Sequence, residues 1–364
     1  MTESKVRCLM VGMGGIASHM LPFLQQKPWY ETTAVLDVND ESLARARILL
    51  TDLPADAFYT SLDEALQKSG ANVAFINTPS QLHYEQAKAA LEAGLHVMVA
   101  KPITNNYEQA TELVEIAKAK KLTLCVGQQV RYHRHYRAVR RFLETGQLGS
   151  VEMINFFNSK PRHQPFNLGD MDHPGLYELS CHHFDSLMSL TPGQIPESIF
   201  CDGFCPSWSV YSGLCSINAL IRFTNGLHVT YQGSFSAQAY NYELRLEGSN
   251  GALRCQGQHM SIDEPMTHEF AARASSFAPT GVDQQIPIEA PFLMFFDKWY
   301  EYLQGGAEPS FSGRNNLKVF ALLSAGIDSI ASGQPIAVAD NPRYAAAFDA
   351  GTEWTRGNDN QPFA

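Results

Sequence analysis

A histidine and two acidic residues recur at helical spacing within residues 176–190, LYELSCHHFDSLMSL. Glu178, His182 and Asp185 occupy positions i, i+4 and i+7, which fall within one narrow arc of an α-helix. A neutral histidine with a pKa of about 6.5 can accept a proton from an alcohol. Such an arc can also simply face solvent, so periodicity alone leaves both interpretations open. His183 competes with His182, but its helical phase points toward the leucine side.

Lys101 is a second candidate for chemistry because it ends the apolar run 96–99 and precedes Pro102. Proline biases the residue before it toward an extended backbone. The pattern therefore predicts Lys101 at the carboxyl end of a strand. Its positive charge could stabilise a developing alkoxide or polarise a carbonyl group.

A glycine-rich loop near the N-terminus, G-x-G-x-x-A, follows one apolar run and precedes a helical pattern. Gly12 allows the tight turn, Gly14 allows close approach of a pyrophosphate, and Ala17 allows close packing of the helix. Asp37, twenty residues after Ala17, is placed to bind the adenosine ribose and to repel a 2′-phosphate. The pattern favours NAD, with NADP as the alternative. The loop residues expected at the cofactor are Gly12, Met13, Gly14, Gly15 and Ile16.

The first 130 residues alternate short apolar runs with helical patterns, which predicts a parallel sheet covered on both faces. The predicted strands are 6–11, 33–37, 73–77, 96–99 and 122–126, and the predicted helices are 16–25, 41–50, 82–93 and 107–120.

From residue 151 the apolar period changes to two, which predicts a mostly antiparallel sheet. Asn225-Gly226 between two alternating runs predicts a hairpin. The predicted strands are 151–158, 216–223, 227–235, 242–246 and 252–255, and two helices follow at 291–303 and 315–331.

The composition is that of a globular protein, with 45% apolar and 18% charged residues among 364. A net charge of −10 argues against nucleic-acid binding. No run approaches the roughly 18 apolar residues of a membrane-spanning helix, and no signal-peptide pattern precedes the glycine loop. We therefore expect a cytoplasmic protein without a membrane partner.

The seven cysteines lie mostly in apolar runs, which indicates reduced thiols. Cys201 and Cys205 lack the spacing of a zinc site, so no metal is expected.

Several segments together resemble the Gfo/Idh/MocA family of glucose–fructose oxidoreductases and inositol dehydrogenases. Its T-P-N-x-x-H and A-G-K-H-V-x-x-E-K-P motifs are matched at Thr78, Pro79, His83, Ala93, Gly94, His96, Val97, Lys101 and Pro102. Ala100 stands where the family usually has Glu. Gln129 and Arg131 align with the family's V-G-F-N-x-R-F segment, and residues 178–185 align with D-x-G-x-H-x-x-D.

The resemblance implies an NAD(P)-binding Rossmann domain at 1–128 and an α+β domain with a large open, mostly antiparallel sheet at 129–338. Residues 339–364 are expected to form a C-terminal extension. The resemblance also implies a homodimer or homotetramer.

By the same resemblance, Lys101, His182 and Glu178 are the expected catalytic residues. The expected cofactor contacts outside the glycine loop are Asp37, Thr78, Pro79, His83, Lys101, Gln129 and Arg131.

The implied activity is NAD(P)-dependent hydride transfer to or from a CH–OH or C=O group of a sugar, polyol or related carbohydrate. Two alternatives remain. One is an enzyme with a transient redox cycle, for glycoside cleavage or epimerisation. The other is a non-catalytic regulator that binds nucleotide and sugar, which Ala100 favours.

Overall fold

The computed structural model describes residues 5–164, 168, 171–256, 259–263, 278–280 and 290–348. The chain divides into two compact units. One contains the described residues of Met1–Gln129 and Ala290–Leu317, and the other those of Val130–Glu289 and Lys318–Ala364. Most of the predicted extension 339–364 lies outside the described residues, which end at 348.

The first unit is built on a parallel sheet of six strands, in the order β3-β2-β1-β4-β5-β6. The sequence order reverses between β1 and β4, and ligands of such sheets bind at this switch point. Its strands are β1 (Val6–Val11), β2 (Tyr30–Leu36), β3 (Phe58–Tyr59), β4 (Val73–Ile76), β5 (His96–Ala100) and β6 (Leu124–Gly127).

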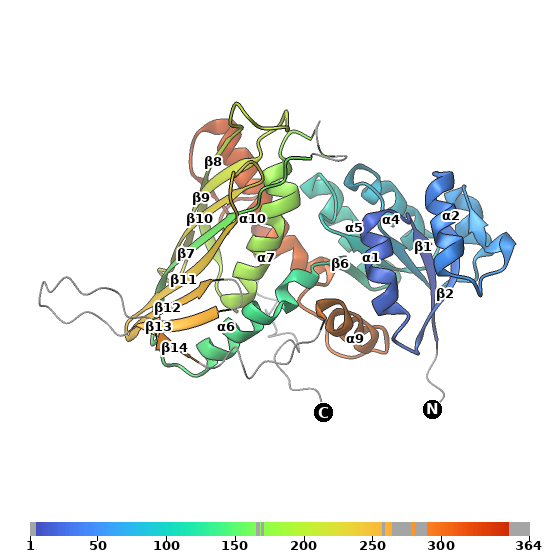
Figure 1. Cartoon of the computed structure of the whole chain (residues 1–364), viewed down its shortest axis with the longest axis horizontal. Helices are drawn as coiled ribbons and strands as arrows, with labels where there is room; N and C mark the ends of the chain where they lie inside the picture. Colours follow the sequence, from blue (N-terminus) through green and yellow to red (C-terminus); the bar gives the residue numbers. More distant parts are fainter. Residues whose placement is uncertain are drawn as a thin grey trace, which may run out of the picture. The chain divides into compact units, whose positions relative to one another are not determined.

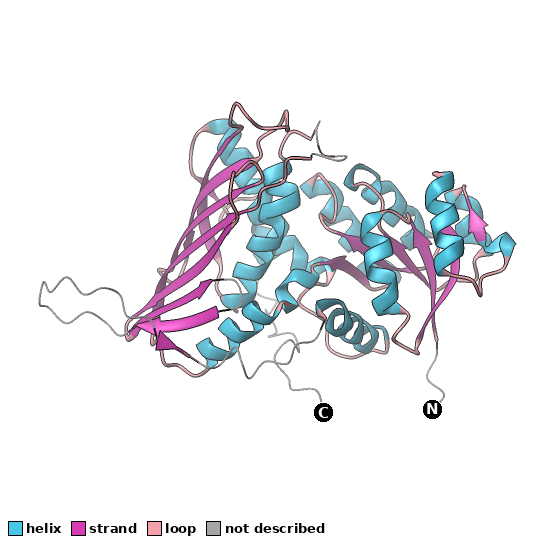
Figure 2. Cartoon of the chain, in the orientation of Figure 1, coloured by secondary structure: helices cyan, strands magenta, loops and turns pink. Residues whose placement is uncertain are grey.

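Helices cover this sheet, as the alternating pattern predicts (Figure 2). Side chains at three N-caps show why helices begin where they do: Asn39, Ser61 and Asn106 each accept a hydrogen bond from a first-turn N–H. The helices are α1 (Gly15–Leu24), α2 (Asp40–Leu49), α3 (Leu62–Lys68), α4 (His83–Glu92), α5 (Tyr107–Lys120) and α9 (Pro291–Leu303), with short 3-10 turns η1 (Ala55–Ala57) and η2 (Ser80–Leu82).

The second unit contains a sheet of nine strands, in the order β14-β13-β12-β11-β7-β10-β9-β8-β15. The β10–β7 pair is parallel and the other pairs are antiparallel. The strands are β7 (Val151–Ser159), β8 (Pro196–Phe204), β9 (Ser216–Phe223), β10 (His228–Ser234), β11 (Asn241–Gly248), β12 (Gly251–Gln256), β13 (His259–Asp263), β14 (Ala278–Pro279) and β15 (Ile336–Ala337).

Helices of the second unit lie along one face of this sheet (Figure 1). They are α6 (Arg134–Glu144), α7 (Cys181–Leu190) and α10 (Gly313–Ser332), and the boundary between the units falls within α10. Shorter turns are η3 (Gln129–Tyr132), η4 (Gly175–Ser180) and η5 (Ala345–Phe348). The predicted fold class, a Rossmann sheet followed by a mostly antiparallel sheet domain, is confirmed.

The hairpin predicted at Asn225-Gly226 joins β9 to β10. Gly226 has a φ of 88°, a left-handed conformation that glycine adopts without steric cost, and the Asn225 side chain accepts the N–H of Leu227.

Helix α9 differs from the predicted division, which assigned it to the second domain. It belongs to the first unit because its aromatic side chains pack on the parallel sheet. Trp299 meets Phe75 edge-to-face at 4.8 Å between ring centroids, and both rings are fully buried. The Tyr30 hydroxyl donates to the carbonyl of Phe296 at 2.9 Å.

This packing predicts that Trp299→Ala lowers the free energy of unfolding of the first unit by about 3–5 kcal/mol, because it leaves a large cavity. Ile48→Ala is the control, because Ile48 is 75% exposed, and should change stability by less than about 0.5 kcal/mol. Urea unfolding followed by far-UV circular dichroism measures both. Equal effects of the two substitutions would contradict the assignment of α9 to this core.

Candidate active site

The glycine loop lies against the turn that follows β4. Gly12 has a φ of 85°, and a Cβ built on it would lie 2.9 Å from Cγ2 of Thr78. A side chain at this position would therefore be strained and would also displace Thr78. The structure thus requires glycine here for its left-handed backbone, as the predicted tight turn does, and also for the close approach of Thr78.

The N-terminus of α1 is open for an anionic ligand. Gly14 is the N-cap and has no side chain to satisfy the first N–H groups. A Cβ on Gly14 or Gly15 would meet no other atom of the described residues within 4 Å. Ala17 is fully buried against the core, whereas Ile16 is 40% exposed. These features fit the pyrophosphate of a dinucleotide.

Asp37 fastens the glycine loop from the end of β2. One carboxylate oxygen accepts the N–H of Met13 at 2.7 Å, and the other accepts the N–H of Asn39 at 2.9 Å. Each oxygen keeps a further lone pair, so the carboxylate can also accept hydrogen bonds from ribose hydroxyls. The position fits the predicted cofactor contact.

His83 connects the Thr78-Pro79 turn to the segment that carries Lys101. It is 1% exposed, and its ring nitrogens lie 2.9 Å from the carbonyl oxygen of Thr78 and 2.7 Å from that of Pro102. Both contacts link the ring to backbone carbonyls on the two segments. The role of His83 at the cofactor stays a prediction.

Lys101 follows β5 directly and is partly exposed, at the carboxyl edge of the parallel sheet as predicted. Its peptide bond to Pro102 is cis. Thr78 and Pro79 lie after the neighbouring strand, β4, so the same edge carries all three residues.

The predicted single helix over 176–190 is wrong in its first part. A π-helical turn, η4, precedes α7, so Glu178 and His182 do not share a regular α-helical arc. In the fully described stretch 175–190, only Tyr177, Glu178 and His182 are partly exposed. The third member of the predicted arc, Asp185, is fully buried.

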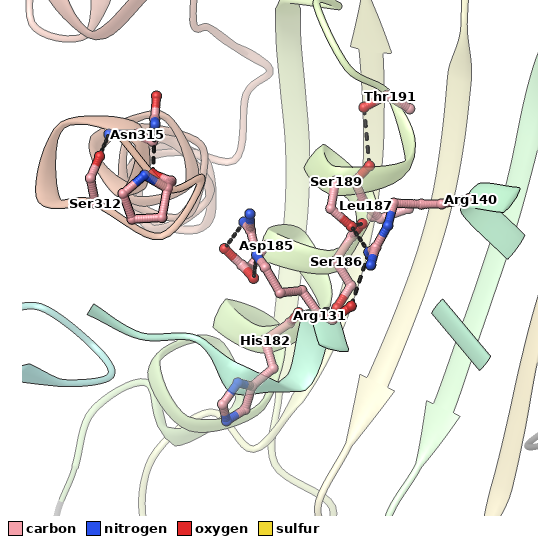
Figure 3. Close-up of polar contacts among 11 residues, drawn as sticks. Arg131, Arg140, His182, Asp185, Ser186, Leu187, Ser189, Thr191, Ser312 and Asn315 are labelled. Carbon is pink, nitrogen blue, oxygen red and sulfur yellow. Dashed lines mark hydrogen bonds and ion pairs between the residues drawn. The ribbon is translucent and has the colours of Figure 1, made fainter. Parts of the chain in front are cut away.

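A buried ion pair explains the position of Asp185 (Figure 3). Arg131 donates from Nε to one carboxylate oxygen at 2.9 Å and from Nη2 to the other at 2.5 Å. Both side chains are essentially inaccessible to solvent. The guanidinium of Arg131, which the sequence predicts as a cofactor contact, binds Asp185 and so positions α7 from within the second unit.

Arg140 supports this pair from α6. Its Nη1 donates to the carbonyl oxygen of Arg131 at 2.9 Å and to Oγ of Ser189 at 3.1 Å. Arg140 thereby links η3 to α7, the helix that carries His182, and Figure 3 shows the His182 ring apart from the ion pair. Gln129, the other predicted contact in this segment, is partly exposed at the start of η3.

His183 is buried and ends a chain of directed hydrogen bonds beneath the π-helical turn. Oγ of Ser180 donates to the carbonyl of Gly175 at 2.8 Å, so the Tyr231 hydroxyl, 3.0 Å away, donates to Ser180. His183 then donates from Nδ1 to the Tyr231 oxygen at 2.7 Å. Its Nε2 is left to accept from Nδ2 of Asn158 at 2.8 Å.

The two neighbouring histidines differ in exposure, as the helical phase predicts. The side chain of His183 is buried, whereas that of His182 is partly exposed and can be reached by solvent or a ligand. Sequence reasoning missed Arg140, Tyr231 and Asn158. Only their burial and contacts distinguish them, because each stands in an otherwise ordinary helix or strand.

Comparison with known proteins agrees with this geometry. The model of the oxidoreductase family with an NAD-binding Rossmann fold matches residues 6–128, and the Gfo/Idh/MocA C-terminal domain matches residues 136–254. The chain belongs to the Gfo/Idh/MocA oxidoreductase family. Its Rossmann domain is accordingly an NAD-binding domain.

Members of the family with similar sequences cover most of the chain. An uncharacterised protein y4oX of Sinorhizobium fredii is 25% identical, over 91% of this chain and 95% of its own. Inositol 2-dehydrogenase of Rhizobium meliloti is 24% identical, over 72% of this chain and 80% of its own.

Among solved structures, the WlbA dehydrogenase of Bordetella pertussis, crystallised with NADH and UDP-GlcNAcA, shares the fold. Its TM-score is 0.80 at 21% identity, and the match covers 93% of this chain and 99% of that chain.

The described residues of this Gfo/Idh/MocA protein contain no helix both long and apolar enough to span a bilayer. They also contain no cluster of three or more His, Cys, Asp or Glu side chains arranged to hold a metal ion.

Breaking the buried ion pair should destabilise the second unit strongly. We expect Asp185→Asn to lower the free energy of unfolding by about 3–5 kcal/mol, because the Arg131 charge stays buried without its carboxylate. The double substitution Arg131→Met with Asp185→Leu should recover much of this loss. Urea unfolding of the three proteins provides the measurement.

The matched control for this prediction is Asp328→Asn, in the half-exposed pair with Arg343, which should cost no more than about 1 kcal/mol. A loss at Asp185 as small as that at Asp328 would contradict the structural role of the buried pair.

The buried His183 also predicts a pH dependence of stability. Burial lowers its pKa to about 3, with smaller effects from Lys160 and His135, whereas the unfolded value is about 6.5. The unfolded chain therefore binds the proton first, and stability falls as pH decreases from about 6.5 toward 3. His183→Gln should reduce the stability lost between pH 7 and pH 5 by about 1–2 kcal/mol.

Urea unfolding at several pH values tests this, with His228→Gln on exposed β10 as the control. An unchanged pH slope in His183→Gln would show that His183 is not the buried neutral group described here.

Proposed function

We propose that this protein is an NAD-dependent dehydrogenase. It transfers hydride between nicotinamide and a CH–OH or C=O group of a sugar, polyol or related carbohydrate. The observation that carries the proposal is selective burial: of the polar residues in the stretch 175–190, Glu178 and His182 stay accessible while Asp185 and His183 are committed to the core. Lys101 stands at the ligand-binding edge of an NAD-binding sheet.

The residues of the first unit would hold the dinucleotide. The open N-terminus of α1 would take the pyrophosphate, and Asp37 would accept from the adenosine ribose. Bound NAD supplies the hydride acceptor, which no side chain can provide.

The proposed roles of the catalytic residues follow from their chemistry. His182 accepts the hydroxyl proton as the substrate is oxidised and returns it in reduction. The ammonium group of Lys101 stabilises the developing negative charge on the substrate oxygen. Glu178 orients His182 or binds a second hydroxyl of the substrate.

Carbohydrate substrates are supported by the family relatives. The inositol 2-dehydrogenase is named for a polyol, and the WlbA dehydrogenase was crystallised with a nucleotide sugar.

A second candidate, a regulator that binds nucleotide and sugar without turnover, is favoured by Ala100 at the position of the family's usual Glu. The three retained reactive side chains favour the enzyme instead.

We also propose a homodimer or homotetramer assembled through the face of the nine-stranded sheet opposite its helices. Leu220 and Met153 are each more than half exposed in β9 and β7, and Phe200 lies directly across from Leu220 in β8. Apolar side chains in this position are suited to bury one another between subunits.

The proposal predicts that NAD⁺ and NADH raise the melting temperature more than NADP⁺ and NADPH, because the Asp37 carboxylate repels a 2′-phosphate. In a screen of sugars and polyols by NADH absorbance, His182→Asn should lower kcat by about 100-fold or more while the NAD⁺-induced shift remains. His228→Asn, on an exposed strand of the same unit, should leave both unchanged.

Full activity of the His182→Asn variant would show that His182 is not a catalytic residue. A clear NAD⁺ shift without turnover of any sugar or polyol would favour the regulator.

A further inference from the structure

Two cysteines flank the loop between β8 and β9. The antiparallel register pairs Gly203 with Ile217 and Phe204 with Ser216. Continuing it by one residue places Cys205 directly across from Cys215. Directly opposed residues of an antiparallel pair have Cα atoms about 4.5–5.5 Å apart, within the range that a disulfide spans.

The two sulfur atoms already face each other. They lie 3.7 Å apart, and Sγ of Cys205 donates to the carbonyl of Tyr211, within the loop, at 3.1 Å. Cys205 is partly exposed, whereas Cys215 is fully buried. A disulfide needs a sulfur separation of about 2.05 Å, so the two side chains and the backbone that carries them must close on each other.

Cys215 has two hydroxyl groups as neighbours. Its sulfur lies 3.1 Å from Oγ of Ser236 and 3.3 Å from Oγ of Ser209. These hydroxyls can donate to the sulfur of a disulfide, which carries no hydrogen of its own. The site therefore accommodates both oxidation states without leaving a buried donor unpaired.

We propose that Cys205 and Cys215 form a reversible disulfide, a redox modification site that takes a peroxide as its oxidant. The partly exposed Cys205 reacts first: its thiolate sulfur bonds to one peroxide oxygen, the O–O bond breaks, and the other oxygen leaves as water. The Cys215 sulfur then attacks Cys205 and displaces the second oxygen as water. Both thiol hydrogens leave in the two waters, and two electrons pass from sulfur to the peroxide.

The loop closed by this pair is fastened to the π-helical turn that carries Glu178. The N–H of Gly175 donates to the carbonyl of Leu214 at 3.0 Å, and the N–H of Leu214 donates to the carbonyl of Asp172 at 2.8 Å. Cys215 also shares a buried apolar cluster with Leu179.

Drawing the two sulfurs together therefore moves backbone that is hydrogen-bonded to η4. The oxidised protein should hold Glu178 differently from the reduced one. This consequence for catalysis rests on the proposed dehydrogenase function; formation of the disulfide does not.

The first experiment treats the whole protein with a small excess of hydrogen peroxide, removes the peroxide, and counts thiols in denaturant with Ellman's reagent. The expected count falls from seven to five. Peptide mass spectrometry should find the segments of Cys205 and Cys215 joined, lighter by two hydrogens, and released by dithiothreitol.

Cys205→Ser and Cys215→Ser should each abolish the joined peptide, while Cys201→Ala, in the strand β8 that Cys205 directly follows, should retain it. Seven remaining thiols, oxygen added to Cys205 without cross-linking, or a pair formed by other cysteines would overturn the site. Because the wild-type protein alone gives this result, the test stands even where a variant fails to fold.

The second experiment compares sugar or polyol oxidation before and after oxidation of the pair. We expect kcat to fall by about tenfold in the wild type, with full recovery in dithiothreitol and no change in Cys205→Ser. The NAD⁺-induced melting shift should persist, since the cofactor residues belong to the other unit. An oxidised protein with unchanged kcat would overturn the link to Glu178, whereas absence of turnover in reduced protein would instead contradict the proposed function.

Discussion

The buried pair of Arg131 and Asp185 is the interaction on which the second unit's candidate site depends. Two charges without solvent are tolerated only when they meet in good geometry, and both carboxylate oxygens here receive a guanidinium N–H. Helix α7 must therefore present Asp185 to Arg131. That requirement fixes the rotation of the helix, on which His182, three residues earlier, stays partly exposed.

Other polar contacts hold further backbone segments of the candidate site in position, in both units. In the second unit, the chain from Asn158 through His183 and Tyr231 holds the π-helical turn in one hydrogen-bonding arrangement. In the first unit, His83 links two ligand-facing turns, and Asp37 holds the glycine loop. The candidate reactive and ligand-binding groups thus lie on backbone that hydrogen-bonded neighbours hold in position, which is what a preorganised site requires.

The first unit could be predicted from sequence in most of its elements because each signal is local. Apolar runs, the G-x-G-x-x-A loop and the Asn225-Gly226 hairpin in the second unit depend on residues close together in the chain. Contacts between distant segments were missed or misjudged. Arg131 was predicted to meet the cofactor because nothing in its segment indicates a carboxylate 54 residues later.

The errors at α9 and η4 have similar causes. The aromatic residues of α9 predict that the helix is buried, but they do not indicate which of the two sheets it packs against. An α-helix and a π-helical turn share the same apolar pattern over a few residues. The sequence therefore does not indicate that a π-helical turn precedes α7. Helix α6 went unpredicted because five basic side chains obscure its apolar face, of which Tyr136, Val139 and Phe142 are buried.

The central claim is that hydride passes between the carbon of a carbohydrate hydroxyl and NAD on this protein. The direct test incubates it with NAD⁺ and sugars or polyols that carry deuterium on the carbinol carbons, then analyses the recovered nicotinamide by mass spectrometry. We expect NADH with deuterium at C4 for at least one substrate. NAD⁺ that binds but never acquires deuterium from any of them would contradict it.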